Sequence, residues 1–473
     1  MAVSIPSAES PTGAVGPLGA VLRRILRGEA GLRALPAVGA RAAGRRGRRW
    51  SPPPRYPARM QPLFDPARHE PLAAATWHPD LASAAIARIA AAAEAEFDDR
   101  EGGWLLHPDD EPPHQGARSS NLYWGAAGVV WALRHLAAAG AIRLSRDYAP
   151  WIARYPDRVR DEAAAEQHGN ASYLFGESGP LLLAWLDTRR EDVADRLHAV
   201  VRGNLHNSAQ EPLWGNAGTL LAAIRMAEAG AGERWDALVA DGVEALAEDM
   251  SIDPEIGSWI WQQDLYGKRS RHLGAGHGLA GNAFAALRGA AHADPARVRA
   301  IADRVEETLS RTALHGDPDA APALANWQPL VDADRLAVWR SRGGHPLVQD
   351  CHGAPGIVCR LAGRVPRNDA WDALLRAAGE LTWQAGPLAK GPSLCHGTAG
   401  SAMACLKLWR LFDEPPWLER ARALALHAAD QVEAVRACHG KGRHSLWTGD
   451  LGVACALWNC VAGDDRFPTL DHF

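Results

Sequence analysis

Two cysteine–histidine dipeptides lie in the last third of the chain, Cys351-His352 and Cys395-His396, and each is followed directly by a Gly-x-x-Gly element. Thiolate and imidazole groups that come together in this way suit Zn²⁺, which prefers sulfur and nitrogen ligands. A third histidine, His277, immediately precedes another glycine element of the same form. Side chains of this kind are not needed to make a turn, so these three loops are the candidates for chemistry.

The two dipeptides could supply as many as four ligands to one ion. A closed tetrahedral set is typical of structural zinc, whereas a catalytic site keeps one position open. Adjacent residues on one backbone point in different directions, so it is demanding for both members of each pair to reach the same ion. The pattern favours three protein ligands and one exchangeable position. The alternative is that these are buried cysteines and hydrogen-bonded histidines with no metal.

The other five cysteines are expected to play no part in this chemistry. Four of them lie in stretches of small apolar residues, where a cysteine packs as a small hydrophobic side chain, and these are Cys359, Cys405, Cys455 and Cys460. The sequence Cys438-His439-Gly440 resembles the dipeptide motif, but it falls well before the glycine element at Gly449. We interpret that match as a coincidence.

The Gly-x-x-Gly element recurs seven times, which is the strongest organisational signal in the sequence. Each copy is followed by a short apolar stretch rich in small residues, without the alternation of a strand. The copies begin and end at Gly125–Gly128, Gly176–Gly179, Gly215–Gly218, Gly278–Gly281, Gly353–Gly356, Gly397–Gly400 and Gly449–Gly452. Seven copies in register predict seven buried helices. Glycine at their starts would permit positive φ and close backbone approach.

Amphipathic segments lie between the glycine elements and carry helix-start signals. Clear examples open at Pro79-Asp80 and Asp294-Pro295; others begin near Glu191, Glu233, Asn368 and Glu414, and a weaker one covers about Ser145–Ala165. Seven amphipathic helices then alternate with seven buried ones. This alternation predicts an all-α fold, an α/α toroid with an inner and an outer ring, in which all seven loops meet at one end.

Composition limits the class of protein. Hydrophobic residues make up 47% of the 473 residues and charged residues 22%, as in ordinary globular proteins, and no apolar run is long enough for a transmembrane segment. The net charge of -4 gives no indication of a nucleic-acid partner. Seven cysteines, an odd number, in a chain with no visible signal peptide favour the reducing cytoplasm.

The first sixty residues differ from the rest. They hold eleven arginines, no lysine and only two acids, a balance of +9, and show no sustained apolar period. We interpret residues 1–60 either as a disordered leader or as the result of a misplaced start, in which case translation begins at Met60. Residues 61–473 are expected to form the folded domain.

The glycine repeats together with the stretches LFGESGPLLLA, PLWGNAGTLLAAI, GAGHGLAG, LVQDCHGAPGI, SLCHGTAGSA and HSLWTGDLG closely resemble the lanthionine synthetase C-like family. The motifs resemble those of the eukaryotic LanC-like branch of this family, and the resemblance covers about Pro79 to Val461. It implies that zinc is held by Cys351, Cys395 and His396. It also implies that His277 is the acid/base residue, and that Lys390 lies near a glutathione site.

Three positions bear on how far the resemblance extends. His352 matches a position that is not a ligand in the family. Bacterial peptide cyclases place an aspartate ahead of the second glycine element, where this chain has Ser172, which puts the cyclase version of the mechanism in doubt. Asp350 stands where many members have tryptophan, which alters the expected wall of the pocket.

The resemblance implies addition of a thiol across the double bond of dehydroalanine or dehydrobutyrine, giving a thioether. Zinc would deprotonate the thiol, whose pKa is otherwise about 8.5, and His277 would protonate the α-carbon. The thiol is glutathione or a peptide cysteine, and Lys390, Lys441 or Arg443 could hold a carboxylate.

Other functions remain open. They are a peptide cyclase that makes lanthionine rings, a zinc-stabilised binding module without catalysis, and a glycosidase-like toroid using Glu177 and Asp450.

Overall fold

The computed structural model describes residues 62–73, 75–110, 116–163, 169–265, 267–331 and 346–473. The interpretation of residues 1–60 as a leader therefore lies outside the described residues. Within the described part, the chain forms fifteen α-helices and three short antiparallel hairpins. In this part, no helix combines the length and the apolar character needed to cross a membrane.

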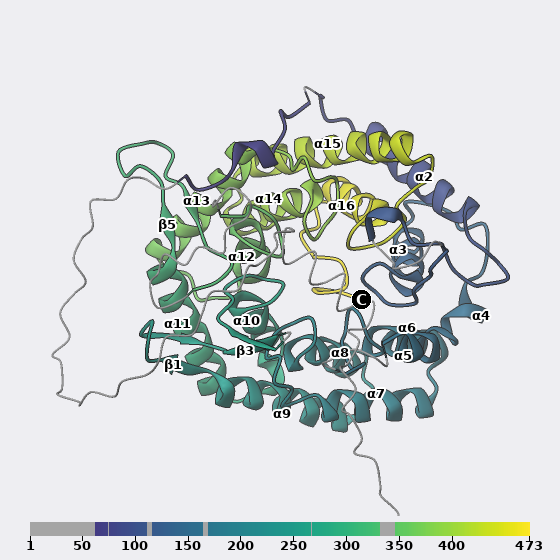
Figure 1. Ribbon diagram of the computed structural model, residues 1–473, viewed down its shortest axis with the longest axis horizontal. Coiled ribbons are helices and arrows are strands. Elements are labelled where there is room, and N and C mark those ends of the chain that lie inside the picture. Colours follow the sequence, from purple (N-terminus) through teal and green to yellow (C-terminus); the bar gives the residue numbers. More distant parts are fainter. Residues whose placement is uncertain (1–61, 74, 111–115, 164–168, 266, 332–345) are drawn as a thin grey trace, which may run out of the picture.

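Seven buried helices form an inner ring, and each begins within one of the seven glycine elements (Figure 1). Their side chains are buried over most of their length because they are covered on all sides. They are α3 (Ala126–Ala138), α6 (Ser178–Thr188), α8 (Asn216–Glu228), α10 (Leu279–Arg288), α12 (Ala354–Leu361), α14 (Thr398–Phe412) and α16 (Asp450–Ala462).

The amphipathic segments form an outer ring around these helices (Figure 1). Start signals act as expected: Asp294 accepts a hydrogen bond from the amide of Ala296, and Asn368 from that of Trp371. The outer helices are α2 (Pro79–Ala95), α4 (Ala149–Ile152), α5 (Tyr155–Ala163), α7 (Glu191–Gly203), α9 (Glu233–Asp249), α11 (Pro295–Thr312), α13 (Asp369–Ala385) and α15 (Pro415–His439). The predicted all-α toroid of two concentric layers is confirmed.

One predicted outer helix is divided. The weak signal over Ser145–Ala165 corresponds to α4 and α5, with the last two residues outside the described part. Pro156 is the reason, because it has no amide hydrogen and its ring would clash with the carbonyl of Ile152 in a continuous helix. The rest of the outer ring follows its sequence signals.

Short hairpins and 3-10 turns, which the sequence pattern did not reveal, fill connections between the helices. The strands pair as β1 (Ser251–Asp253) with β2 (Ser258–Ile260), β3 (Gln263–Leu265) with β4 (Lys268–Ser270), and β5 (Leu314–His315) with β6 (Ala325–Asn326). The 3-10 turns are η1 (Pro66–Arg68), η2 (Pro108–Asp110) and η3 (Ala290–His292).

The second glycine of every element has the same steric reason to be glycine. A Cβ on Gly128 would lie 2.1 Å from the carbonyl oxygen of Leu122, and one on Gly400 would lie 2.2 Å from that of Leu394. In all seven copies this contact is with the carbonyl six residues earlier. Positive φ occurs at only one of the fourteen repeat glycines, all of which are described, and that one is Gly353. Close approach therefore explains the repeat.

The C-terminal residues lie near the centre of the ring (Figure 1). Asp471 accepts hydrogen bonds from Arg364 and from Lys407, the latter at 2.7 Å, and its own carbonyl accepts one from Arg288 at 3.3 Å. Arg364 follows the end of α12, Lys407 lies in the C-terminal half of α14, and Arg288 is the last residue of α10. The tail therefore closes the end of the inner ring opposite the glycine loops. We call the loop end the mouth and the tail end the base.

Candidate functional site

The residue two places before each glycine element occupies an equivalent position at the mouth. We call these seven residues the rim ring, and all of them line one cavity. They are Tyr123, Leu174, Leu213, Gly276, Cys351, Cys395 and Trp447.

Backbone hydrogen bonds join neighbouring members of the rim ring. The amide of Cys351 donates to the carbonyl of Cys395 at 3.0 Å, and the amide of Cys395 donates to that of Trp447 at 3.0 Å. The series continues from Trp447 to Tyr123 at 3.0 Å, and from Gly276 to Cys351 at 3.0 Å. The two cysteines are therefore neighbours because their loops are.

The other junctions close the ring through the second, third and fourth loops. The amide of Tyr123 donates to the carbonyl of Leu174 at 3.1 Å, and the hydroxyl of Ser172 donates to the carbonyl of Leu213. Ser172, which stands where cyclases have an aspartate, thus has a structural partner. The last junction, between the third and fourth loops, is the contact between His277 and Glu211.

The side chains of Cys351 and Cys395 are buried and hydrogen bonded to each other. The Cys395 thiol lowers the pKa of Cys351, whereas the same contact raises the pKa of Cys395 well above its usual value. The side-chain amide of Gln349 donates to Cys351 Sγ at 2.9 Å, and the Tyr123 hydroxyl bonds to Cys395. The two cysteines therefore lie in contact, and each sulfur also accepts a hydrogen bond from a neighbouring side chain.

The cavity bounded by the rim ring contains about 760 Å³ of space not filled by atoms, part of it open to solvent. Both thiols and His277 face it, and much of the remaining lining is apolar, including Leu221, Phe284 and Leu470. Leu470 belongs to the C-terminal tail, so the tail supplies part of the cavity wall. A pocket with a few convergent polar groups in an apolar lining is typical of a small-molecule or peptide site.

His277 is buried and its Nδ1 lies 2.8 Å from Oε2 of Glu211. Glu211 is also completely buried, and it accepts backbone amide hydrogens from Leu213 and Trp214. Because a carboxylate only accepts, Nδ1 is the donor in this contact. The carboxylate therefore fixes the orientation of the imidazole.

Two further histidines lie beside His277. Its ring centroid is 5.8 Å from that of His352 and 5.6 Å from that of His272. Burial lowers the pKa of His352 to about 3, and it lowers that of His272 well below its usual value. The Glu211 carboxylate lies on the ring of His277, which makes this histidine the candidate acid.

Asp350 forms a buried ion pair with Arg360, at 2.7 Å between Oδ2 and Nη2. Both residues line the cavity, and the Arg360 guanidinium lies 4.6 Å from the ring centroid of Phe467. Burial raises the pKa of Asp350. The predicted change of the pocket wall at Asp350 is therefore the introduction of a charged pair.

The three basic residues considered as carboxylate ligands differ in their surroundings. Lys390 is exposed at the mouth, where the surrounding protein lowers the pKa of its ammonium and the nearby thiols of Cys351 and Cys395 oppose that shift. Lys441 instead donates to the carbonyl of Leu106 at 3.1 Å, and Arg443 pairs with Asp110. Lys390 is thus the better placed of the three.

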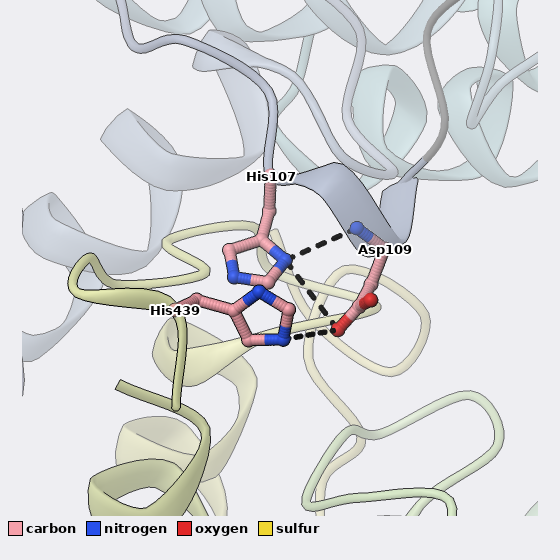
Figure 2. Close-up of side chains that lie close together, drawn as sticks. All are labelled: His107, Asp109 and His439. Atoms are coloured by element: carbon pink, nitrogen blue, oxygen red, sulfur yellow. Dashed lines mark hydrogen bonds and ion pairs between the residues drawn. The ribbon is translucent and has the colours of Figure 1, made fainter. Parts of the chain in front are cut away.

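The donors suit zinc, because two thiols touch and the buried His396 Nδ1 has no hydrogen-bond partner in the described chain. Among the described residues, however, Cys351, Cys395 and His396 are not a set whose ligand atoms all lie within 4.8 Å of one another; a different set of three side chains is. It consists of His107, Asp109 and His439 (Figure 2). The sequence pattern drew attention to His439 only through the Cys438-His439 match that we interpreted as a coincidence, and it gave no indication of His107 or Asp109.

The two carboxylates of the glycosidase alternative point to the outer ring. Glu177 binds Arg196 of α7, and Asp450 lies 3.3 Å from Arg436 of α15. Because each is already matched by an arginine of its own, they do not flank a common substrate position. The glycosidase reading therefore has no support at these two residues.

Sequence reasoning missed Glu211 and Tyr123. Both had a detectable signal in the repeat register: Tyr123 is in the same place as the two cysteines, and Glu211 is an acid four residues before a glycine element. Glu211 is the one charged residue at its repeat position, where the other six copies have neutral residues, and that charge would have singled it out.

Comparison with known proteins agrees with this architecture. A family model described as "Lanthionine synthetase C-like protein" matches residues 116–471. The zebrafish (Danio rerio) protein called glutathione S-transferase LANCL1 is 27% identical over 321 residues, covering 63% of this chain and 70% of that protein. The Arabidopsis thaliana LanC-like protein GCL1 is 35% identical over 129 residues, covering 26% of this chain and 30% of that protein.

Among solved structures, nisin cyclase superposes with a TM-score of 0.54 at 17% sequence identity, covering 74% of this chain and 93% of the cyclase. At this identity the likeness concerns the fold. The family match spans the glycine loops, both cysteines of the rim ring and His277. The chain belongs to the lanthionine synthetase C-like family.

Proposed function

We propose that this chain adds a thiol to dehydroalanine or dehydrobutyrine in a peptide or protein, with zinc as cofactor and glutathione as the thiol. A carbon–sulfur bond forms at the β-carbon while the carbon–carbon double bond is lost. The thiol proton is released, and another proton is delivered to the α-carbon. The product is a thioether.

One observation carries this proposal: two touching thiols and a buried imidazole–carboxylate pair face the same cavity. Thiols suit the activation of an incoming sulfur, and a protonated imidazole suits the delivery of a proton at carbon. Both functions are needed in the same addition, at neighbouring atoms of one substrate.

Cys351, Cys395 and His396 are the residues that would hold the zinc. The metal would supply a lowered pKa for the bound thiol, so that a thiolate exists at neutral pH. His396 has to turn toward the two sulfurs for this, and its unpartnered Nδ1 gives it a reason to do so. Cys351 keeps the hydrogen bond from Gln349, which orients its sulfur.

His277 is assigned as the acid that protonates the α-carbon, and Glu211 as the residue that holds it in position. The apolar part of the cavity excludes water from the enolate formed by the attack, which favours protonation by the positioned imidazole over protonation by water. Lys390, exposed at the mouth near both thiols, is assigned to a carboxylate of glutathione.

The name of the zebrafish relative supports glutathione as donor, whereas the fold likeness to nisin cyclase supports a peptide cysteine. Ser172 favours the first, because it replaces the acidic group of the cyclases with a hydroxyl that is engaged with Leu213. All seven cysteines, each within the described residues, are free of disulfides, which supports a reducing compartment such as the cytoplasm.

The decisive experiment incubates the purified chain with zinc, glutathione and a peptide that contains both dehydroalanine and a cysteine. Mass spectrometry after alkylation of free thiols, which adds mass only to an unreacted cysteine, then distinguishes the outcomes. A glutathione adduct supports the proposal, a new ring of unchanged mass supports the cyclase, and an unmodified peptide with zinc bound supports the binding module. The last two results would overturn the proposal.

Two variants assign the roles. Cys395→Ala is expected to lose zinc and activity, whereas Cys405→Ala, a buried cysteine of α14 outside the cavity lining, keeps both. His277→Asn is expected to keep zinc and to lose roughly 100-fold or more in turnover, the usual contribution of a general acid. Full turnover by His277→Asn would remove it from the mechanism.

A further inference from the structure

A second group of metal-ligating side chains lies outside the cavity. His107 and Asp109 belong to the turn at η2, and His439 is the last residue of α15, more than three hundred residues later (Figure 2). None of the three lines the cavity that holds the thiols. Their ligand atoms all lie within 4.8 Å of one another.

The distances within this group fit coordination better than hydrogen bonding. Oδ2 of Asp109 lies 3.5 Å from Nδ1 of His107 and 3.6 Å from Nε2 of His439. Hydrogen bonds between such groups are shorter, at about 2.7–3.2 Å. Two metal–ligand bonds of about 2.1 Å meeting at a tetrahedral angle place their ends about 3.4 Å apart. The carboxylate oxygen faces both imidazoles at nearly that separation.

The buried histidine is in the right tautomer to be a ligand. The amide of Asp109 donates to His107 Nδ1 at 3.2 Å, so the ring proton is on Nε2 and a lone pair on Nδ1 faces the group. The long amide contact would give way to a metal bond. The His107 side chain is 1% exposed, whereas Asp109 is 47% and His439 30% exposed, so water can complete the coordination.

The neighbouring cations are matched by other partners. Arg443, which lies beside His107, pairs with Asp110, and Asp110 also accepts from the Thr448 hydroxyl at 2.7 Å. Lys441 donates to the carbonyl of Leu106. Asp110 therefore carries the ion pair with Arg443, which also donates to the backbone carbonyl of Asp109 at 3.4 Å, whereas the Asp109 carboxylate contacts the two histidines and, in the described chain, no lysine or arginine.

We propose that His107, Asp109 and His439 form a second metal site, specific for a divalent transition metal such as Zn²⁺. Two imidazoles and one carboxylate favour zinc and its neighbours over calcium or magnesium, which prefer all-oxygen ligands. A metal there joins the η2 turn to the end of α15, beside the seventh loop. This proposal is independent of the proposed catalytic function.

The test uses the full chain stripped of metal and titrated with Co²⁺, whose absorption distinguishes sulfur ligands from nitrogen and oxygen ligands. Wild type is expected to bind two equivalents, one with a sulfur-to-metal charge-transfer band and one without. His439→Ala and His107→Ala should each lose the equivalent that lacks this band and keep the other. His315→Ala, which removes an exposed histidine of β5, is the matched control and should keep both.

A single equivalent in wild type, with the sulfur band only, would overturn the second site. So would an equal loss in His315→Ala, which would indicate adventitious binding to surface histidines. The converse variant, Cys351→Ser/Cys395→Ser, should keep one equivalent without the band. Zinc should also raise the melting temperature of that variant, and adding His439→Ala should abolish the rise, because only a ligand of the native state stabilises it.

Discussion

The two ends of the inner ring are held together by different means. At the mouth, most junctions between loops are backbone hydrogen bonds, such as that from Cys351 to Cys395. At the base, long charged side chains converge on Asp471. Backbone contacts leave side chains available for chemistry, whereas ion pairs occupy the side chains that make them. We therefore expect changes at the base to affect stability and changes at the mouth to affect reactivity.

The largest expected effect is at the base. Asp471→Asn removes the carboxylate shared by Arg364 and Lys407, which is only 7% exposed and keeps only Asp465 at 3.1 Å, and should lower the free energy of unfolding by about 3–5 kcal/mol. Turnover per folded molecule should stay near wild type. Asp192→Asn, which breaks the exposed pair with Arg190, is the control and should cost less than about 1 kcal/mol. Equal losses in urea unfolding would show that the base is not under special constraint.

The next effect concerns the one junction of the mouth that is made by two side chains. Glu211→Gln keeps the shape of the side chain but removes the charge that orients His277. We expect turnover to fall roughly 100-fold, about 2.7 kcal/mol in the barrier, with zinc content and KM for the thiol unchanged. If KM rises instead while turnover is kept, Glu211 has only a structural role in the ring.

The third expected effect is a pH dependence of about 2 kcal/mol in the free energy of unfolding, caused by a histidine at the base. Burial lowers the pKa of His472 to about 3, while the unfolded chain has a value near 6.5. Below pH 6.5 the unfolded chain takes up a proton that the folded chain does not, so stability falls as pH decreases. Between pH 7 and pH 5 this loss is about 2 kcal/mol for one such group.

His472→Phe keeps an aromatic ring and removes the titration. Its free energy of unfolding should therefore fall less than that of wild type between pH 7 and pH 5, by about 2 kcal/mol. Parallel decreases in the two proteins would contradict the assignment of this pH dependence to His472.

The smallest effect is expected at Gly276. A Cβ there would lie 2.9 Å from Cβ of Cys351, so Gly276→Ala should displace that cysteine and weaken zinc binding roughly 10-fold. Gly203→Ala is the control, because an added Cβ at Gly203 meets nothing within 4 Å. If both variants bind zinc like wild type, the space beside Cys351 is not needed for the site.

Much of this architecture could be predicted because each repeat carries its own steric constraint. The second glycine must be free of a Cβ to pass the carbonyl six residues earlier, and that requirement is visible in sequence as Gly-x-x-Gly. The division between α4 and α5 was not predicted because the amphipathic signal there is weak, although Pro156 lies close to the start of the second helix.

The site was only partly predictable for a different reason. Cys351 and Cys395 could be expected to meet because they share a repeat position. The contact of His277 with Glu211 and that of His439 with Asp109 break the repeat pattern, since each joins residues at unlike positions. No periodicity in the sequence reports a contact of that kind.

The rim ring has a consequence for how such a protein can change. Its seven members occupy equivalent positions around one opening, and most neighbouring positions are joined by a single backbone hydrogen bond. A single substitution can therefore place a reactive side chain at another position of the rim ring without a change in the backbone. Trp447 occupies the position beside Cys395, so a thiol or imidazole introduced there would lie next to the two cysteines. A thiol or imidazole introduced at Leu174 would instead face the two cysteines from across the opening.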